Sequence, residues 1–180
     1  DYMTINTSQS NYTFTSDETY YISGAVVLTG TTTFEGGTVV KMDASTSAKL
    51  EVQGSLNFGG APYRPVVFTA KDDNSVGQTI SGSTGDPTTT YYGASGGTLV
   101  LNNGTGVTLT HLRLSHQRRA LDFAGGTGHI VRHAQVVRCQ EGVDPVNTVN
   151  LHNILFHNVD KVLAGTAATV NGQHLTVNVA

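Results

Sequence analysis

The sequence predicts an all-β fold, a single-stranded parallel β-helix of about seven coils, and two observations carry this prediction. The first is a four-residue phrase that begins at His111, His133, Asn153 and His174, with offsets of 22, 20 and 21 residues. Fixed periods of this length are typical of solenoids. The second is that each phrase alternates apolar and polar residues, which is the period of a strand. A strand that recurs at this interval is one rung of a coiled sheet.

Composition limits the classes of protein that fit. The 180 residues suit one domain, and with 21 glycines and only 13% charged residues the chain is typical of a turn-rich β protein. A formal charge of −3 gives no polycationic face, so we expect no nucleic-acid partner. No run of 18 apolar residues occurs, so we expect no membrane insertion. The single Cys139 is expected to pack as a small apolar residue.

The first half of the chain divides into a leading segment and regular coils. Residues 1–19 are polar with weak alternation, and we expect a leading strand or an N-terminal cap there. The β-helix domain is expected over 20–180. Apolar or alternating runs predict strands at 20–22, 26–28, 38–42, 50–58 and 66–70. Glycines between these runs are interpreted as corners between sheet faces.

Residues 71–97 interrupt the pattern and are expected to form an irregular inserted loop. A loop of this length in a compact domain is usually functional. Tyr91 and Tyr92 lie in it and are candidate ligand-binding residues, because aromatic rings stack on sugars and the chain has no Trp.

The same loop holds an oxygen-rich cluster. Asp72, Asp73, Asn74 and Asp86 are candidate ligands of calcium, a hard cation that prefers oxygen donors. The alternative is that these side chains cap turns. No other cofactor is predicted.

The regular second half predicts three inward-facing sets of side chains. Residues expected to stack in these columns are Val107, Leu109, Ile130 or Val131, Val149 and Leu151 on one face, Leu112, Leu114, Ala134, Val136, Ile154, Phe156, Leu175 and Val177 on the second, and Leu121, Val143 and Leu163 on the third. Equivalent residues on successive rungs would lie about 4.8 Å apart.

The rungs of the form Val-x-Leu-x-His/Asn-x-x-Leu resemble the right-handed parallel β-helix repeats of the pectate-lyase-like superfamily. The segment Thr33–Lys41 with Leu50–Leu56 and Pro65–Thr69 is similar to opening coils of large secreted bacterial β-helix proteins. The resemblance covers about residues 20–180. It implies a right-handed coil, a secreted or cell-surface location in a bacterium, and an asparagine-type ladder at a tight corner. Asn153 matches that corner, and His111, His133 and His174 stand in the equivalent place.

The histidine column admits two interpretations. Side chains at such a corner bond to the backbone of neighbouring turns, which makes a structural ladder. Three histidines on one edge could also bind a transition metal, although imidazoles stacked one rung apart are poorly placed for tetrahedral coordination. We expect the ladder.

Asp122 and Asp144 lie 22 residues apart, in the register of the repeat, and are expected one rung apart on the third face. Two carboxylates at that separation repel, which raises at least one pKa and can create an acid/base pair. Arg118 and Arg119 precede Asp122. These four residues are the candidate catalytic set if the chain is an enzyme. The alternative is a solvated face on which Arg and Asp pair across rungs.

The function expected from these features is a non-catalytic structural or ligand-presenting module. The resemblance implies pectate lyases and related hydrolases as relatives, but no third acid follows Asp144, since Ala164 stands in that register. The alternatives are a polysaccharide lyase or glycoside hydrolase, or a glycan-binding domain. Because the chain starts at Asp1 and ends in a strand-like segment, we also expect a processed piece of a secreted protein, which continues in a larger chain or associates end to end into fibres.

Overall fold

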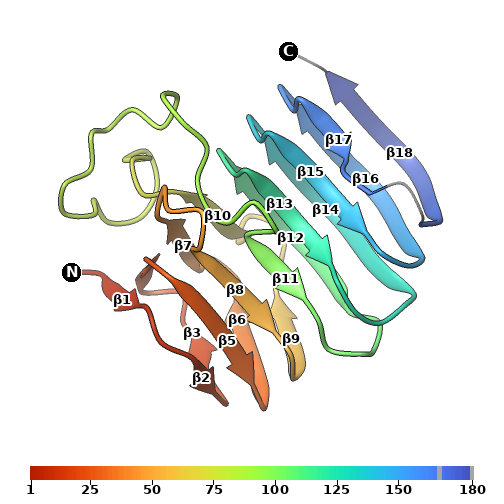
Figure 1. The fold of residues 1–180 in the computed structure, drawn as a ribbon, viewed down its shortest axis with the longest axis horizontal. Coiled ribbons are helices and arrows are strands. Elements are labelled where there is room, and N and C mark those ends of the chain that lie inside the picture. The colour runs from red at the N-terminus through yellow and green to blue at the C-terminus, as the bar shows by residue number, and fades with distance from the viewer. Residues whose placement is uncertain (166–167, 179–180) are drawn as a thin grey trace.

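The computed structural model describes residues 1–165 and 168–178, and these form 18 strands and no helix. The strands make three sheets whose neighbouring strands run parallel (Figure 1). Sheet A contains β1 (Met3–Ile5), β4 (Thr19–Ile22), β7 (Val39–Met42), β10 (Val66–Ala70), β12 (Thr108–Ser115), β14 (His129–Val137), β16 (Val149–His157) and β18 (Val170–Asn178). Sheet B contains β2 (Gln9–Ser10), β5 (Ala25–Thr29), β8 (Lys49–Val52), β11 (Leu99–Leu101), β13 (Arg119–Phe123), β15 (Glu141–Pro145) and β17 (Lys161–Leu163). Sheet C contains β3 (Thr13–Phe14), β6 (Thr31–Glu35) and β9 (Ser55–Gly59).

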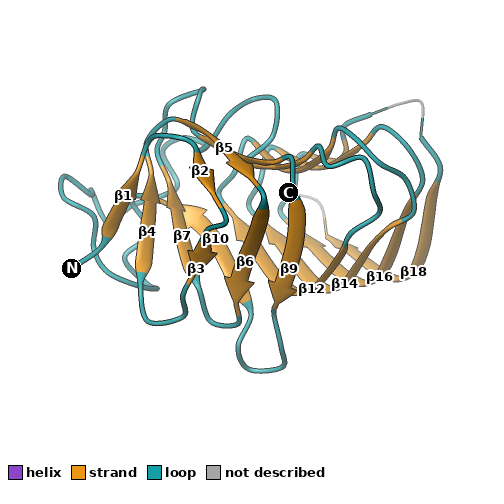
Figure 2. Cartoon of the chain, turned by 90° about the horizontal axis from the view of Figure 1, so that it is seen from below, coloured by secondary structure: helices purple, strands orange, loops and turns teal. Residues whose placement is uncertain are grey.

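The architecture is a parallel β-solenoid of about eight turns, so the predicted fold class is confirmed. The sequence predicts about seven coils, and the additional turn comes from the N-terminal segment. There β1, β2 and β3 pair in register with β4, β5 and β6 and form a turn of their own. Their alternation is short because each of these strands has only two or three residues, which is why the sequence signal is weak. Figure 2 shows the strands of successive turns stacked along one axis.

The long strands of sheet A bend in the middle, at a residue with a left-handed backbone. His111, His133, Asn153 and His174 have φ between 51° and 55°, at the fourth, fifth, fifth and fifth positions of β12, β14, β16 and β18. Non-glycine residues rarely adopt this conformation, and Asn and His are among those that do so most readily. The two halves of each bent strand lie on two different faces of the solenoid. Because every turn needs this bend, a residue that adopts the left-handed conformation recurs with the period of the repeat.

The core consists of stacked apolar columns. The sequence leaves open whether Ile130 or Val131 points inward. In the structure Val131 lies inside, and Ile130 lies partly exposed on the outside. The neighbouring inward residue is His129, which is fully buried and accepts the Val107 N–H at Nδ1 (3.3 Å) while Nε2 lies 2.8 Å from the Gly125 carbonyl oxygen. In the turn that contains β17 and β18, the apolar side chains Leu163, Leu175 and Val177 are 38%, 39% and 51% exposed.

The inserted loop lies on the outer face of sheet A. No strand occurs between β10 and β11, as the sequence predicts, but the loop is tied to the sheet beneath it. The fully buried Lys41 ammonium donates to the carbonyl of Asp73 (2.7 Å), and the Gln78 N–H donates to Thr19 Oγ1 (2.9 Å). A buried ammonium is stable only when hydrogen-bonded, so the loop and Lys41 depend on each other. Within the described residues no long apolar helix of the membrane-crossing kind occurs.

Candidate functional site

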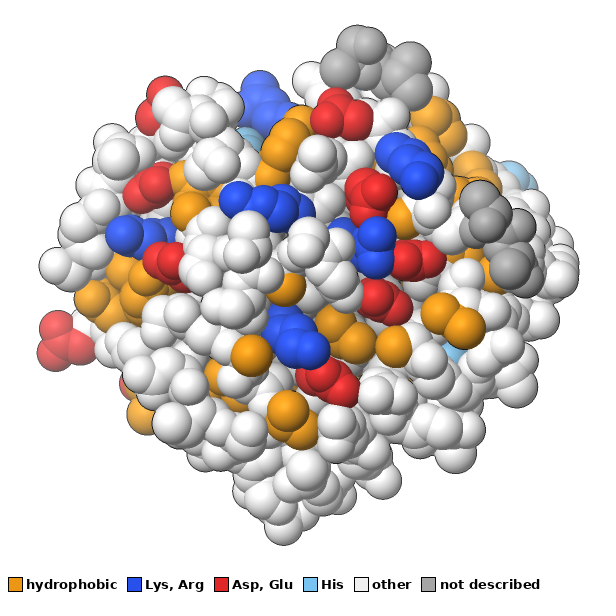
Figure 3. Space-filling view, in the orientation of Figure 1, with side chains coloured by type: hydrophobic (Ala, Val, Ile, Leu, Met, Phe, Trp, Pro, Cys, Tyr) orange, Lys and Arg blue, Asp and Glu red, His pale blue; other side chains and the backbone are white. Residues whose placement is uncertain are grey.

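The first candidate site is a group of charged side chains on the outer face of sheet B, which we call the charged strip. It comprises Lys49, Glu51, Arg119, Asp122, Glu141, Asp144 and Lys161, all of which take part in ion pairs. Figure 3 shows basic and acidic side chains gathered and interleaved on this face. Strands β8, β13, β15 and β17 contribute to it. Asp122 pairs in register with Asp144, and Arg119 at the start of β13 is in register with Glu141 and Lys161.

Within the strip, Asp122 and Asp144 are direct neighbours in the pairing of β13 with β15. Arg119 lies against both, with Nη1 2.6 Å from Asp144 Oδ2 and 3.7 Å from Asp122 Oδ2. Its Nε donates to Glu141 Oε2 at 2.7 Å. One guanidinium therefore faces three carboxylates, and the two predicted acids come together with a cation between them.

Burial distinguishes the two aspartates. The pKa of Asp122 is raised to about 6, first by burial and then by the like charge of Asp144, while Arg119 opposes the shift. The end of the inserted loop packs against this side chain: Gly97 has φ +114°, and a Cβ there would lie 2.6 Å from the Asp122 Cβ. Only glycine fits this close approach, so the backbone of the loop contributes to the burial of Asp122.

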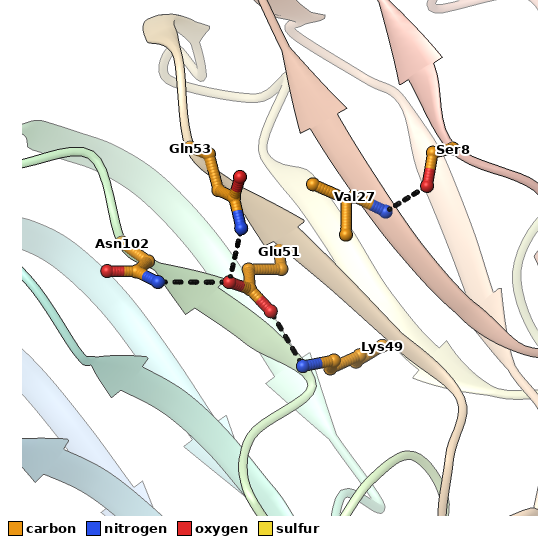
Figure 4. Close-up of polar contacts among 6 residues, drawn as sticks. All are labelled: Ser8, Val27, Lys49, Glu51, Gln53 and Asn102. Atoms are coloured by element: carbon orange, nitrogen blue, oxygen red, sulfur yellow. Dashed lines mark hydrogen bonds and ion pairs between the residues drawn. The ribbon is translucent and has the colours of Figure 1, made fainter.

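The other end of the strip is built around Glu51. Its carboxylate accepts hydrogen bonds from Lys49 (2.7 Å), Gln53 (2.8 Å) and Asn102 (3.0 Å), as Figure 4 shows. The bonds from Lys49, Asn102 and Gln53, in that order of size, lower the pKa of Glu51 to about 2. Glu51 is therefore ionised at physiological pH and its oxygen atoms are occupied.

Arg118, the other predicted cation, does not lie in the strip. Its Nη1 donates to the carbonyl oxygens of Ala44 (3.0 Å) and Gly93 (2.7 Å), and so it fastens the end of the inserted loop to the β7–β8 connection. A guanidinium used in this way is not available to a substrate. We therefore remove Arg118 from the candidate catalytic set.

The second candidate site is a pocket of about 450 Å³ between the inserted loop and a corner of the solenoid, which we call the corner pocket. The corner residues follow β12, β14 and β16 and are His116, Arg138 and Asn158, with φ of 62°, 51° and 52°. The loop contributes the wall from Pro87 to Tyr91, and Asp160 closes the far side. Pockets of roughly 300–1,000 Å³ are the size range of small-ligand sites.

The two tyrosines of the loop have different environments. Tyr91 lines the corner pocket and its hydroxyl donates to Asp160 Oδ2 at 2.9 Å. Tyr92 has no exposed surface, and its hydroxyl donates to Asp72 beneath the loop. An aromatic residue without exposed surface contacts no ligand, so Tyr92 is a core residue of the loop and the prediction of ligand binding is wrong for it.

Electrostatics in the corner pocket depend on three groups. Burial lowers the pKa of His116, which is only 9% exposed, so this imidazole is neutral at physiological pH. Arg138 is exposed, and Asp160 keeps one carboxylate oxygen on Tyr91. The pocket therefore presents one cation and one anion.

The predicted calcium ligands point to different partners. Asp72 accepts from Tyr92 and from the Thr84 N–H, Asp73 from Thr69 and Ser75, and Asp86 from Thr88. Asn74 accepts from the hydroxyl of Ser83. Among residues 1–165 and 168–178, no group of three or more His, Cys, Asp or Glu side chains is placed to hold a metal. These four residues do what turn-capping side chains do.

The predicted ladder residues stack along one edge of the solenoid. The rings of His111 and His133 lie parallel with centroids 4.8 Å apart, and Asn153 Nδ2 lies 2.8 Å from His133 Nδ1. Side-by-side rings put their nitrogen atoms on neighbouring rungs and not around a common point, which favours the structural ladder over a metal site.

No protein-family model matches this chain, and neither a curated protein nor a solved structure shows significant similarity to it.

Sequence reasoning missed the corner pocket, although a signal for it exists. His116, Arg138 and Asn158 each follow a ladder residue by five positions and repeat with its spacing. The constant spacing of five residues between the two sets predicts a second left-handed corner in each of these turns. Glu141 and Lys161 of the strip were missed as well, and they lie in register with Arg119 along β13, β15 and β17.

Proposed function

We propose that this chain is a non-catalytic, ligand-presenting β-solenoid module of a secreted or cell-surface protein, with the corner pocket as its ligand site. The observation that carries the proposal is the pocket itself, which combines an aromatic ring, hydroxyl groups and opposite charges where the Pro87–Tyr91 stretch of the inserted loop meets a corner of the solenoid. Sequence resemblance supports the right-handed, pectate-lyase-like form of the fold and a bacterial origin. A glycan is the ligand class that we expect.

The charged strip supports a non-catalytic role. Arg119 occupies the space between Asp122 and Asp144 and is held there by Glu141. A substrate would have to displace this guanidinium from three carboxylates to reach either acid. Ion pairs between neighbouring strands stabilise a sheet that carries charged residues side by side on one face, so these charges have a structural role.

Binding of glycans on an array tests the proposal. We expect the wild-type protein to bind a limited set of glycans, and Tyr91→Ala to lose that binding. Tyr63→Ala serves as the matched control, because Tyr63 is a fully exposed tyrosine that lies outside the corner pocket. Silence of the wild-type protein across the array would contradict a glycan-presenting role.

A carbohydrate-active enzyme, lyase or hydrolase, is the second candidate, and one observation favours it. The pKa of Asp122 is raised to about 6 beside a second aspartate, which is how acid/base pairs of glycosidases are arranged. Cleavage of a panel of neutral and acidic polysaccharides decides the matter. This reading requires activity in the wild-type protein that falls by at least about 100-fold in Asp122→Asn. Absence of cleavage by the wild-type protein leaves the module as the function, whereas cleavage that Asp122→Asn does not diminish rules out Asp122 as the catalytic acid.

We also propose association at the turn that contains β17 and β18. Leu163, Leu175 and Val177 expose apolar surface there, whereas Val143, Ile154 and Phe156 one turn earlier are buried. A further rung, from the same polypeptide or from a second copy, would cover them.

A further inference from the structure

The corner pocket contains two opposite charges that do not neutralise each other. Within residues 1–165 and 168–178, no ion pair of 4.0 Å or shorter involves Arg138 or Asp160, although both line the same pocket. The hydrogen bond from Tyr91 to Asp160 Oδ2 holds the carboxylate on the side of the loop. The guanidinium of Arg138 makes no hydrogen bond in the same part of the chain.

An unpaired guanidinium in a pocket can bind a carboxylate or a phosphate through two parallel N–H groups, and the carboxylate is the smaller of these two anions. An anion alone would also face the negative charge of Asp160. A cation alone would face Arg138. A ligand that carries both charges satisfies both groups, and the neutral His116 on the floor adds no further charge.

We propose that the corner pocket binds a small polar group carrying both a carboxylate and an ammonium. Two sources have this chemistry: a free α-amino acid, and an amino-bearing acidic sugar unit. The carboxylate lies on Arg138, and the ammonium lies on Asp160 opposite it. Asn158 and the Thr88 hydroxyl, which also line the pocket, provide hydrogen bonds to the neutral part of the ligand. This inference rests on the proposed ligand-presenting function and specifies its ligand.

Tyr91 has a positioning role in this site. Its hydroxyl keeps Asp160 away from Arg138, so Tyr91→Phe frees the carboxylate to pair with the guanidinium and to close the site. We expect this variant to lose affinity for the doubly charged ligand while its spectrum remains that of a folded protein.

Titration of the ¹⁵N-labelled protein, followed by NMR, tests the proposal with five probes. L-Serine and muramic acid carry both charges and represent the two sources. Lactate carries only a carboxylate, ethanolamine carries only an ammonium, and glucose carries neither charge. We expect the amide signals of residues 88–91, 138 and 158–160 to shift with L-serine or muramic acid at concentrations at least tenfold below those needed for the other three. The tighter of the two probes identifies the source.

Isosteric variants complete the test. Arg138→Gln and Asp160→Asn should each weaken the binding of the doubly charged probe at least tenfold. Arg132→Gln is the matched control, since Arg132 is an exposed arginine of β14, the strand that Arg138 follows, and lies outside the pocket; it should change nothing.

Two outcomes overturn the inference. If glucose binds at the corner pocket as well as the doubly charged probes do, the ligand is a neutral sugar; the inference is then wrong while the proposed function stands. If no probe shifts these amide signals and the glycan array is also silent, both are wrong.

Discussion

At the scale of the residue, two carboxylates of the charged strip should respond to pH in opposite directions. The pKa of Asp122 is raised to about 6, whereas the pKa of Glu51 is lowered to about 2. The folded protein therefore holds a proton on Asp122 that the unfolded chain has released, and it holds Glu51 ionised where the unfolded chain takes up a proton. Stability contributed by Asp122 falls as pH rises from about 4 to 6, and that from Glu51 falls as pH drops from about 4.5 to 2.

The variant Asp122→Asn should reveal the first effect. The amide of Asn has no charge to desolvate. The melting temperature of the variant, relative to that of the wild-type protein, should therefore rise as the pH increases from 4 to 7. Loss of the Arg119–Asp122 contact reduces this gain slightly. Thermal unfolding at intervals of half a pH unit measures this. Glu51→Gln is the control of opposite sign, with its deficit largest near neutral pH. A pH-independent difference in Asp122→Asn would show that Asp122 titrates normally in the folded state.

A second prediction at this scale concerns the left-handed corners. His133→Val should lower the free energy of unfolding by about 1–2 kcal/mol, since a β-branched residue is strained at φ 54°. His133→Asn should be close to neutral, because Asn adopts this conformation readily and its amide can bond within the ladder. Urea unfolding of both variants measures the difference. Equal losses would mean that the imidazole matters and the backbone does not.

At the scale of the element, the inserted loop acts as a fixed cover of sheet A, and Tyr92 is one of its anchors. Tyr92→Phe removes the hydrogen bond from a buried hydroxyl to the Asp72 carboxylate, and a hydrogen bond to a charged group typically contributes about 1.5–3 kcal/mol. We expect the loss to fall on the loop, seen as faster amide hydrogen exchange and proteolysis within residues 71–91 while the strands of sheet A keep their protection.

Tyr91→Phe is the matched comparison for the loop. Its hydroxyl bonds to the exposed Asp160 and not to a buried group, so loop protection should change little. If both variants open the loop equally, Tyr92 is not a specific anchor.

Elements with strong periodicity could be predicted from sequence, and those held by tertiary contacts could not. The repeat at His111, His133, Asn153 and His174 was sufficient for the solenoid, because each rung buries the same small set of positions. The path of the loop could not be predicted: it depends on Lys41 meeting the carbonyl of Asp73, residues 32 positions apart with no shared pattern.

The candidate site divides in the same way. Asp122 and Asp144 come together because the period of the repeat places them in register, and sequence alone gave that pairing. The contact of Asp122 with Gly97 brings the end of the inserted loop onto β13, and the corner pocket forms where the loop meets a distant turn. Neither contact leaves a local signature in the sequence.

At the scale of the whole molecule, the exposed apolar groups of the last described turn should drive association. We expect the average mass of the wild-type protein, measured by sedimentation over a dilution series, to rise with concentration. The double variant Leu175→Lys/Val177→Lys should remain monomeric, because lysines on an exposed strand oppose edge pairing. Electron microscopy of the same samples distinguishes fibres from closed pairs. Concentration-independent monomers of the wild-type protein would contradict self-association.

The two left-handed corners of a turn bracket four residues in three successive turns: 112–115, 134–137 and 154–157. A residue gained or lost between such corners would turn the rest of that strand inside out, since side chains alternate between the faces. The two corners therefore keep the number of residues between them constant, and insertions or deletions are tolerated only in the other connections of a turn. New binding surface can be added where the 71–97 loop already leaves the solenoid, while the segments between the corners keep the turns aligned.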